Sequence, residues 1–365
     1  RVLAVVCLSV LLLGACTPKP VVLDFSKGAN ALDPNLTAEI DGIVEGVMQQ
    51  IPLAGASVAV YKTGEPVFVK AYGHANLDAE EMTTPETRYR FASVSKVMTG
   101  AAILQLVDKG DLALDTTVKD IWPDMPGNAD QVTIEMLMSH TAGFPEDDPI
   151  IETLGWDMSQ TYSAEERLEL LRRIFSEMDI HPDGTGLYSN MGITTLAMIV
   201  EEVSGMPWKE YFESNIAAPA GMTDTAHCLS LPEGTAQGYA NMEGEWLPMP
   251  PSKDFSGIAY GAGAICGTAS DLLRFHVALS DGTLIKVETY EAMLEVVIDE
   301  VLGTAFGYGQ TMMLMPPDGD LHYAGHIGGV DGYMTLMFTY PADGVYVVMI
   351  ANTLSGMATI GQGNG

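Results

Sequence analysis

The sequence predicts an α+β fold in which an antiparallel sheet, formed from both ends of the chain, is flanked by helices and joined to a mostly helical lobe. Two hairpin patterns predict the sheet. Residues 56–72 form two β-rich runs around a Lys-Thr-Gly-Glu turn, and residues 333–340 and 345–352 form two more around Pro-Ala-Asp-Gly. Between them, residues 93–200 are mostly helical in pattern. Strands near both ends with a helical middle indicate one sheet that both ends share.

The elements follow this scheme in chain order. A helix is expected over residues 36–50, whose apolar side chains recur at helical spacing on one face: Ile40, Ile43, Val44, Val47 and Met48. The first hairpin should have strands at 56–61 and 66–72. No internal repeat or low-complexity segment interrupts the series, so we expect residues 36–365 to form the folded domain, with the sheet lobe from both ends and the helical lobe in the middle.

Composition indicates a globular protein and argues against a polyanionic partner. Of the 365 residues, 47% are hydrophobic and 18% are charged, which is typical of a chain that buries a large core. The 48 acidic residues outnumber the 17 basic ones and give a net charge of −31. Because nucleic-acid binding needs a basic face, we expect no nucleic-acid partner. We interpret the acidity as a well-solvated surface.

The N-terminus has the pattern of a targeting segment. A basic residue precedes an apolar run over residues 2–13, which is too short to span a bilayer. The Leu-Gly-Ala-Cys sequence that ends at Cys16 resembles a bacterial lipobox, whose cysteine is lipidated. We therefore expect a signal peptide at 1–15, a tether at 16–35, and an exported lipoprotein that contacts the membrane only through its anchor and faces the periplasm or cell exterior. An ordinary secretory signal is the alternative. The chain begins with Arg rather than Met, so the completeness of its ends stays open.

Cysteine use leaves one pairing open. Apart from Cys7 in the signal segment and Cys16, only Cys228 and Cys266 remain. In an exported protein these two either form a disulfide or stand as separate buried thiols. No Cys-x-x-Cys pattern or His/Cys cluster has the spacing of metal ligands, so we expect no metal site.

A serine and a lysine one helical turn apart begin the long helical region. In the Ser-Val-Ser-Lys run at 93–96, the first and last residues share a helix face, so the Lys96 amine can reach the Ser93 hydroxyl. A desolvated lysine can act as the base that a serine needs to become a nucleophile. Ser93 would also lie at a helix N-terminus, which favours negative charge. Two further motifs follow downstream: Tyr188-Ser189-Asn190 and His326-Ile327-Gly328.

In this order, the three motifs resemble those of the penicillin-binding protein and serine β-lactamase superfamily, most closely its class C-like branch, which also contains DD-peptidases, D-amino-acid peptidases and esterases. The resemblance covers residues 36–352. Four further segments are similar to recurring segments of the family: 133–145, 219–225, 262–272 and 325–333. The resemblance implies a β-lactamase/transpeptidase-like fold with the active site between its two lobes.

The resemblance also implies a role for each motif residue. Ser93 would attack a carbonyl carbon and form an acyl-enzyme, with Lys96 beside it as base or electrostatic partner. Tyr188 would relay a proton if nearby cations lower its pKa, and Asn190 would orient Lys96 and hold a substrate amide. Backbone N–H groups of Ser93 and Gly329 would form an oxyanion hole. The substrate-binding residues would be His326, Gly328 and Gly329. No cofactor is expected.

Departures from the family bear on the substrate. Histidine stands at position 326, where class A β-lactamases and penicillin-binding proteins have lysine, and in this it is more similar to the peptidase and esterase relatives. A histidine with an ordinary pKa is mostly neutral at pH 7.5, so it attracts a substrate carboxylate weakly. Asp331 stands where relatives often have proline. His140 suggests a Ser–His pair, but we expect a structural role for it.

These observations predict a serine hydrolase that acts through an acyl-enzyme on an ester or a peptide, such as a cell-wall D-amino-acid peptide. Its partner would be that small-molecule or peptide substrate. A class C-like β-lactamase and a non-catalytic penicillin-binding-like lipoprotein are the alternatives, and the complete Ser93, Lys96, Tyr188 and Asn190 set disfavours the second. The sequence names neither the substrate nor the oligomeric state.

Overall fold

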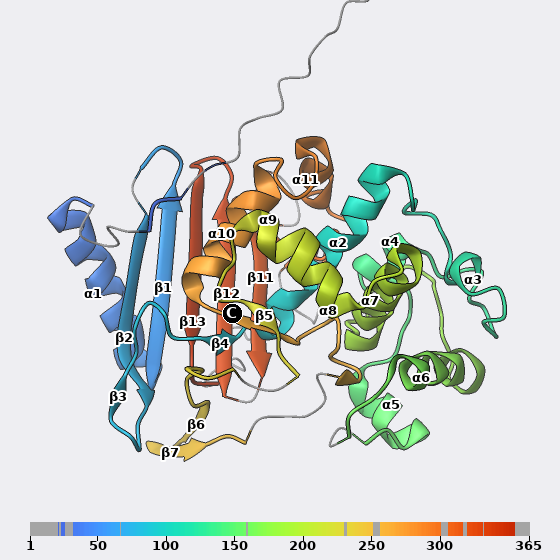
Figure 1. Ribbon diagram of the computed structural model, residues 1–365, viewed down its shortest axis with the longest axis horizontal. Helices are drawn as coiled ribbons and strands as arrows, with labels where there is room; N and C mark the ends of the chain where they lie inside the picture. The colour runs from blue at the N-terminus through green and yellow to red at the C-terminus, as the bar shows by residue number, and fades with distance from the viewer. Residues whose placement is uncertain are drawn as a thin grey trace, which may run out of the picture.

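The computed structural model describes residues 21, 23–25, 32–65, 67–157, 160–229, 232–250, 256–300, 306–316, 320–330 and 332–354. Within them, a large antiparallel sheet carries helices on both faces, and a helical lobe lies beside it (Figure 1). The predicted signal peptide, the lipidation site Cys16 and the departure at Asp331 lie outside the described residues. Among the described helices, none combines the length and the apolar character that a bilayer-spanning segment requires.

In the described part of the chain, the main sheet has eight strands in the order β3-β2-β1-β13-β12-β11-β10-β9. Their bounds are β1 Gly55–Lys62, β2 Phe68–Asn76, β3 Glu81–Met82, β9 Gly307–Tyr308, β10 Met313–Met315, β11 Tyr323–Val330, β12 Tyr333–Tyr340 and β13 Val345–Ala351. Strand β1 pairs antiparallel with both β2 and β13, so Ala56 lies opposite Tyr72 on one side and Ala351 on the other. Strands from the two ends of the chain therefore share one sheet, as the hairpin patterns predict.

Different helices cover the two faces of the sheet. Helix α1 (Pro34–Gln50) packs on one face, where Val58 of β1 belongs to its apolar layer. Helix α10 (Ala269–Ser280) lies across β13 and β1 on the other face (Figure 1). Successive side chains of a strand point to opposite faces, so the next residue, Ala59, belongs to the layer under α10.

The helical lobe is built around α2, which is buried along most of its length. The helices of the lobe are α2 Ser95–Lys109, α3 Val118–Ile121, α4 Ile134–Met138, α5 Asp147–Leu154, α6 Ala164–Glu177 and α7 Asn190–Ser204. Helices α2 and α7 pack against each other, which brings the two halves of the predicted site together. Further helical segments of the described residues are η2 Ala92–Val94, α8 Trp208–Tyr211, the π-helical η3 Phe212–Ala217, α9 Ala218–Ala220 and α11 Val287–Met293.

Short strands form two separate small sheets. The described residues contain a three-stranded sheet with the order β4-β8-β5 and a two-stranded sheet of β6 and β7. Their bounds are β4 Tyr89–Arg90, β5 Ala226–His227, β6 Tyr239–Met242, β7 Glu245–Pro248 and β8 Ile265–Gly267. A disulfide joins Cys228, which follows β5, to Cys266 in β8, with their Cα atoms 5.9 Å apart. The pairing that the sequence leaves open is therefore formed, and it fastens β5 to the central strand β8.

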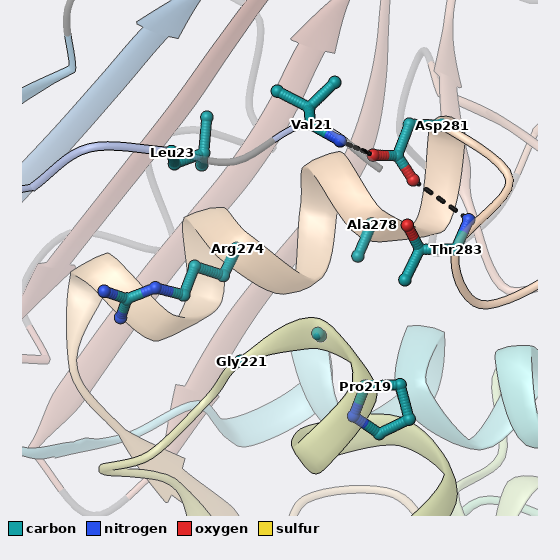
Figure 2. A pocket seen from close by; sticks show the side chains of 9 residues that line it. Val21, Leu23, Pro219, Gly221, Arg274, Ala278, Asp281 and Thr283 are labelled. Carbon is teal, nitrogen blue, oxygen red and sulfur yellow. Dashed lines mark hydrogen bonds between the residues drawn. The ribbon is translucent and has the colours of Figure 1, made fainter. Parts of the chain in front are cut away.

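The segment just before the folded domain lies along α10. The backbone N–H of Val21 donates to the Asp281 carboxylate at 2.8 Å, and the Arg274 guanidinium lies 4.0 Å from the centre of the Phe25 ring. Between this segment, α9 and α10 there is a cavity of about 240 Å³ (Figure 2). No residue of the three predicted motifs lines this cavity, so it is separate from the candidate active site.

Candidate active site

Ser93 lies in a short 3₁₀ turn, η2 (Ala92–Val94), directly before α2. The sequence predicts that the helix begins at Ser93, whereas the regular α-helix begins at Ser95. The Ser95 hydroxyl accepts a hydrogen bond from the N–H of Ile265 in β8 at 3.3 Å, which ties the turn to that strand. Ala92 has a φ of 49°, a left-handed conformation that is uncommon for alanine and is found mostly where the surrounding structure enforces it. The turn leaves Ser93 partly exposed between buried neighbours.

Lys96 lies beside the nucleophile, as predicted. Its Nζ atom is 2.9 Å from Ser93 Oγ and 3.0 Å from the carbonyl oxygen of Ala262. The side chain is fully buried, and this burial lowers the pKa of Lys96 to about 7, while the charge of Asp147 acts in the opposite direction. Near neutral pH, much of Lys96 is therefore an amine. Its lone pair can accept the Ser93 proton while one N–H donates to Ala262.

Tyr188 lies on the other side of the same lysine. The Lys96 Nζ atom is 4.9 Å from the centre of the Tyr188 ring. Burial raises the pKa of Tyr188 above its ordinary value, and a hydrogen bond with Ser93 opposes that rise. The condition that nearby cations lower this pKa is therefore not met, and Tyr188 is a protonated phenol that can donate to a developing negative charge.

Asn190 begins α7 and contacts a carboxylate that belongs to none of the three motifs. Its Nδ2 atom donates to Asp147 Oδ2 at 2.7 Å. Asp147 is the first residue of α5, and burial raises the pKa of its carboxyl group, while the charge of Lys96 acts in the opposite direction. The expected contact of Asn190 is with Lys96, but the hydrogen bond found here goes to Asp147. The only sequence signal for Asp147 is its place in a Glu-Asp-Asp run directly after the family-like segment 133–145.

His140 is part of the wall of the site, and its described contacts are with Tyr188, Tyr308 and Ser189. Its ring lies 4.4 Å from the Tyr188 ring and 4.9 Å from the Tyr308 ring, measured between centres. Its Nδ1 atom accepts a hydrogen bond from the Ser189 N–H at 3.3 Å. Burial, with the nearby Lys96 charge, holds the pKa of His140 well below its usual value. A neutral, packed ring agrees with the structural role expected for this histidine.

His326 lies on β11 and is fully buried. Its Nε2 atom is 3.0 Å from the Tyr308 hydroxyl, and its Nδ1 atom is 2.6 Å from the carbonyl oxygen of Ile327. Burial, reinforced by the Lys96 charge, lowers the pKa of His326 to about 3. The ordinary pKa assumed from the sequence is therefore wrong for this residue, and His326 is neutral at physiological pH. Its predicted contact with substrate stays a prediction.

The two glycines of the third motif follow His326 on β11. A Cβ atom at Gly328 would lie 3.0 Å from the backbone nitrogen of Ser93 and 2.5 Å from the carbonyl oxygen of Phe91. Only a residue without a side chain therefore lets β11 approach the nucleophile turn this closely. Gly329 is the next residue and pairs with Met334 of β12. The predicted oxyanion hole of the Ser93 and Gly329 N–H groups is compatible with this approach and stays a prediction.

The fold thus brings Ser93, Lys96 and Tyr188 into contact and places Gly328 against the turn. Asn190 is linked to this group through its hydrogen bond to Asp147, whose charge acts on Lys96. Two residues that surround this group, Asp147 and Tyr308, lie outside every motif and family-like segment, whereas Ala262 begins the family-like segment 262–272. Among the described residues, no three His, Cys, Asp or Glu side chains are grouped as metal ligands would be.

Comparison with known proteins agrees with this arrangement. A family model described as Beta-lactamase matches residues 40–361. Esterase EstB of Burkholderia gladioli is 28% identical, over 91% of this chain and 97% of its own. The solved structure of D-amino acid amidase from Ochrobactrum anthropi SV3 with L-phenylalanine amide has a TM-score of 0.74 and 25% identity, covering 87% of this chain and 91% of that chain.

The penicillin binding protein of Bacillus halodurans is also similar, with a TM-score of 0.73, 28% identity and coverage of 87% of this chain and 98% of that chain. These matches confirm the predicted α+β, β-lactamase/transpeptidase-like fold and the predicted serine hydrolase chemistry. Because the family model spans most of the chain, the protein belongs to the beta-lactamase family and is a serine hydrolase of that family.

Proposed function

We propose that this hydrolase cleaves ester or amide bonds of small molecules or short peptides, and that it prefers substrates without a carboxylate over carboxylated β-lactams. The observation that carries the proposal is the buried Lys96 amine 2.9 Å from Ser93 Oγ. This pair supplies a nucleophile and a base near neutral pH without any cofactor. The names of esterase EstB and of D-amino acid amidase support ester and amide substrates.

In the proposed reaction, neutral Lys96 accepts the Ser93 proton as Oγ bonds to the substrate carbonyl carbon. The N–H groups of Ser93 and Gly329 stabilise the oxyanion. When the ester or amide bond breaks, the Tyr188 phenol donates its proton to the leaving group and takes one from the Lys96 ammonium. Water then attacks the acyl-enzyme, gives a proton to Lys96, and releases the acid as Ser93 recovers its proton.

The preference against carboxylated substrates rests on charge. A lysine in the third motif would be a fixed cation, whereas His326 is buried and its pKa is lowered to about 3. A neutral imidazole offers a carboxylate little attraction. The net charge of −31 also disfavours an anionic substrate. Nothing in the site favours the β-lactamase alternative.

The nucleophile assignment is tested with Ser93→Ala. We expect this variant to lose p-nitrophenyl butyrate hydrolysis by several powers of ten, because the acyl-enzyme cannot form. Intact-mass spectrometry should show an acyl adduct on the wild-type protein and none on the variant. The exposed Ser176→Ala is a matched control that should keep both properties. An adduct that persists on Ser93→Ala would assign the nucleophile elsewhere.

We also propose export and lipid anchoring at Cys16. The apolar run at 2–13 and the lipobox-like sequence support it, and the Cys228–Cys266 disulfide suits an oxidising compartment. The test is detergent phase partitioning of protein expressed in a bacterium with its own N-terminus. The wild-type protein should enter the detergent phase, and the Cys16→Ser variant should not. Wild-type protein found unmodified in the aqueous phase would contradict this proposal.

A further inference from the structure

The segment 258–262 is held between the two helices that carry the first and second motifs. Helices α2 and α7 pack against each other, and the segment bonds to both. A Cβ atom at Gly261 would lie 2.6 Å from the Ala197 Cβ atom of α7, so only glycine allows this close approach. Because glycine has wide conformational freedom, other contacts must fix the direction of its peptide groups.

Two threonines hold both backbone polar groups of Gly261. The Thr99 hydroxyl of α2 donates to the Gly261 carbonyl oxygen at 2.6 Å. The Thr194 hydroxyl of α7 donates to the Ile258 carbonyl oxygen at 2.6 Å and accepts from the Gly261 N–H at 3.1 Å. Both threonines are fully buried, and a β-branched side chain is restricted at χ1 in a helix. The two hydroxyls therefore fix the segment from both sides.

These contacts differ from the usual contact of a helical threonine. Thr195, the neighbour of Thr194, is equally buried, and its hydroxyl donates to the Met191 carbonyl oxygen in its own helix at 2.9 Å. Thr99 and Thr194 instead use their hydroxyls on a segment that is distant in sequence. Their hydrogen bonds therefore connect separate parts of the fold.

The last residue of the segment contacts the predicted base. The Ala262 carbonyl oxygen lies 3.0 Å from Lys96 Nζ, which is also 2.9 Å from Ser93 Oγ. Lys96 and Thr99 are three residues apart on α2, so successive turns of one helix donate to successive carbonyl groups of the segment. Because the peptide unit between Gly261 and Ala262 is planar, a bond that fixes the first carbonyl also limits the position of the second.

The direction of the lysine amine follows from this arrangement. A neutral primary amine has two N–H groups and one lone pair, and it can rotate about its Cε–Nζ bond. When one N–H of Lys96 donates to the Ala262 carbonyl, the lone pair can face Ser93 Oγ and accept its proton. A carbonyl displaced from this position would no longer select that orientation.

We propose that Thr99 and Thr194 are positioning residues for the base of this reaction. They hold the segment where the Ala262 carbonyl accepts one N–H of Lys96, which leaves the amine lone pair directed at Ser93. The proposal rests on the proposed function, in which neutral Lys96 takes the Ser93 proton. In this scheme the two threonines act through the segment and not on the reacting atoms.

The test measures the reactivity of Ser93 in variants that lack one hydroxyl. Diethyl p-nitrophenyl phosphate forms a bond between Ser93 Oγ and phosphorus, releases p-nitrophenolate and leaves the serine proton on Lys96. At pH 8.5, above the Lys96 pKa of about 7, the lysine is mainly an amine, so the rate reports its position. Thr99→Val and Thr194→Val should each react about ten to a hundred times more slowly than the wild type, because a misplacement of about 1 Å has an effect of this size.

Conservative variants and a matched control separate positioning from a general loss of packing. Thr99→Ser and Thr194→Ser keep the hydroxyl and should react at close to the wild-type rate. Thr195→Val removes an equally buried hydroxyl that bonds to its own helix, and it should also keep the wild-type rate. With p-nitrophenyl butyrate, kcat of the valine variants at positions 99 and 194 should fall by a similar factor, with KM little changed, because substrate binding is not altered.

Circular dichroism and urea denaturation check that each variant is folded. If one valine variant does not fold, the other decides, and if neither folds, Thr99→Ala and Thr194→Ala replace them, because alanine removes the hydroxyl without adding an atom. Three results would overturn the proposal: folded variants without the hydroxyl that react at the wild-type rate, an equal slowing in Thr195→Val, or a rise of KM with kcat unchanged. Failure of the proposed function is a different result, namely modification that persists in Ser93→Ala.

Discussion

Burial decides what single residues of this site can do. Lys96 and His326 are fully buried and Tyr188 is half-buried, and burial favours the neutral form of each. Lys96 becomes a base near neutral pH, Tyr188 stays a proton donor, and His326 stays uncharged. The same burial that keeps His326 of the third motif uncharged therefore makes Lys96 of the first motif a base. A histidine with a pKa of about 3 does not titrate between pH 5.5 and pH 8.5, so His326 cannot change substrate preference across that range.

The pKa of Lys96 predicts the pH dependence of the reaction. The base is the neutral amine, so kcat/KM for p-nitrophenyl butyrate should rise with pH and reach half its maximum near pH 7. Because the Asp147 charge raises the pKa of Lys96, Asp147→Asn should move the midpoint to lower pH. Lys96→Arg should lose activity at least about a thousandfold at every pH, because arginine does not give up its proton. A profile with no inflection between pH 6 and pH 8 would show that Lys96 is not the base.

Local spacing explains which site residues the sequence reveals. Ser93 and Lys96 are three residues apart, and any helical turn brings such residues together, so their contact follows from the sequence. Asp147 and Tyr308 reach the site only through the fold, and nothing in the surrounding sequence specifies their partners. The pKa of His326 depends on burial by segments distant in sequence, which explains why its ordinary value was the wrong assumption.

At the scale of elements, the nucleophile turn is held between two strands. Strand β8 bonds to Ser95 from one side, and β11 approaches Ser93 from the other. The long strands of the main sheet were predictable because their β-rich runs are long and are separated by clear turn signals. Strands β4, β5 and β8 have two or three residues each, too few to show an alternation of apolar and polar side chains. The small sheet that supports the nucleophile turn could therefore not be predicted from the sequence.

The approach of β11 predicts the effect of a single methyl group. In Gly328→Ala, the new Cβ atom would lie 2.5 Å from the Phe91 carbonyl oxygen, so β11 or the turn must move. Such a shift displaces the Ser93 N–H from the predicted oxyanion position, and kcat/KM for p-nitrophenyl butyrate should fall at least tenfold. Gly42→Ala is the matched control, because a Cβ atom there meets nothing within 4 Å. Full activity in folded Gly328→Ala would mean that this close approach is not needed for catalysis.

At the scale of the whole molecule, a strongly acidic surface encloses buried histidines. Burial lowers the pKa of His227 to about 4 and that of His276 to about 3, and neither residue belongs to the predicted motifs. The His276 ring lies edge-on to Tyr346, with ring centres 5.2 Å apart, and neither ring nitrogen has a hydrogen-bond partner among the described residues. Protonating such a ring inside the fold is unfavourable, so these histidines link stability to pH.

The sign of that link follows from comparing the folded and unfolded chains. Below pH 6.5 the unfolded chain protonates its histidines, whereas the folded chain keeps them neutral until the pH approaches 3 to 4. The free energy of unfolding should therefore fall as pH drops from 7 to 5.5, by about 1 kcal/mol for each buried histidine. Over this range the many surface carboxylates stay ionised, so their mutual repulsion changes little.

The contribution of one histidine can be isolated by urea denaturation of His276→Phe at pH 7 and pH 5.5. Phenylalanine keeps an aromatic ring against Tyr346 but cannot take up a proton, so the loss of stability between the two pH values should be about 1 kcal/mol smaller than in the wild type. His322→Phe alters an exposed histidine and should keep the wild-type difference. If His276→Phe and the wild type lost equal stability on acidification, proton uptake by His276 would not contribute to unfolding, and the acid sensitivity of this fold would have to come from its other buried groups.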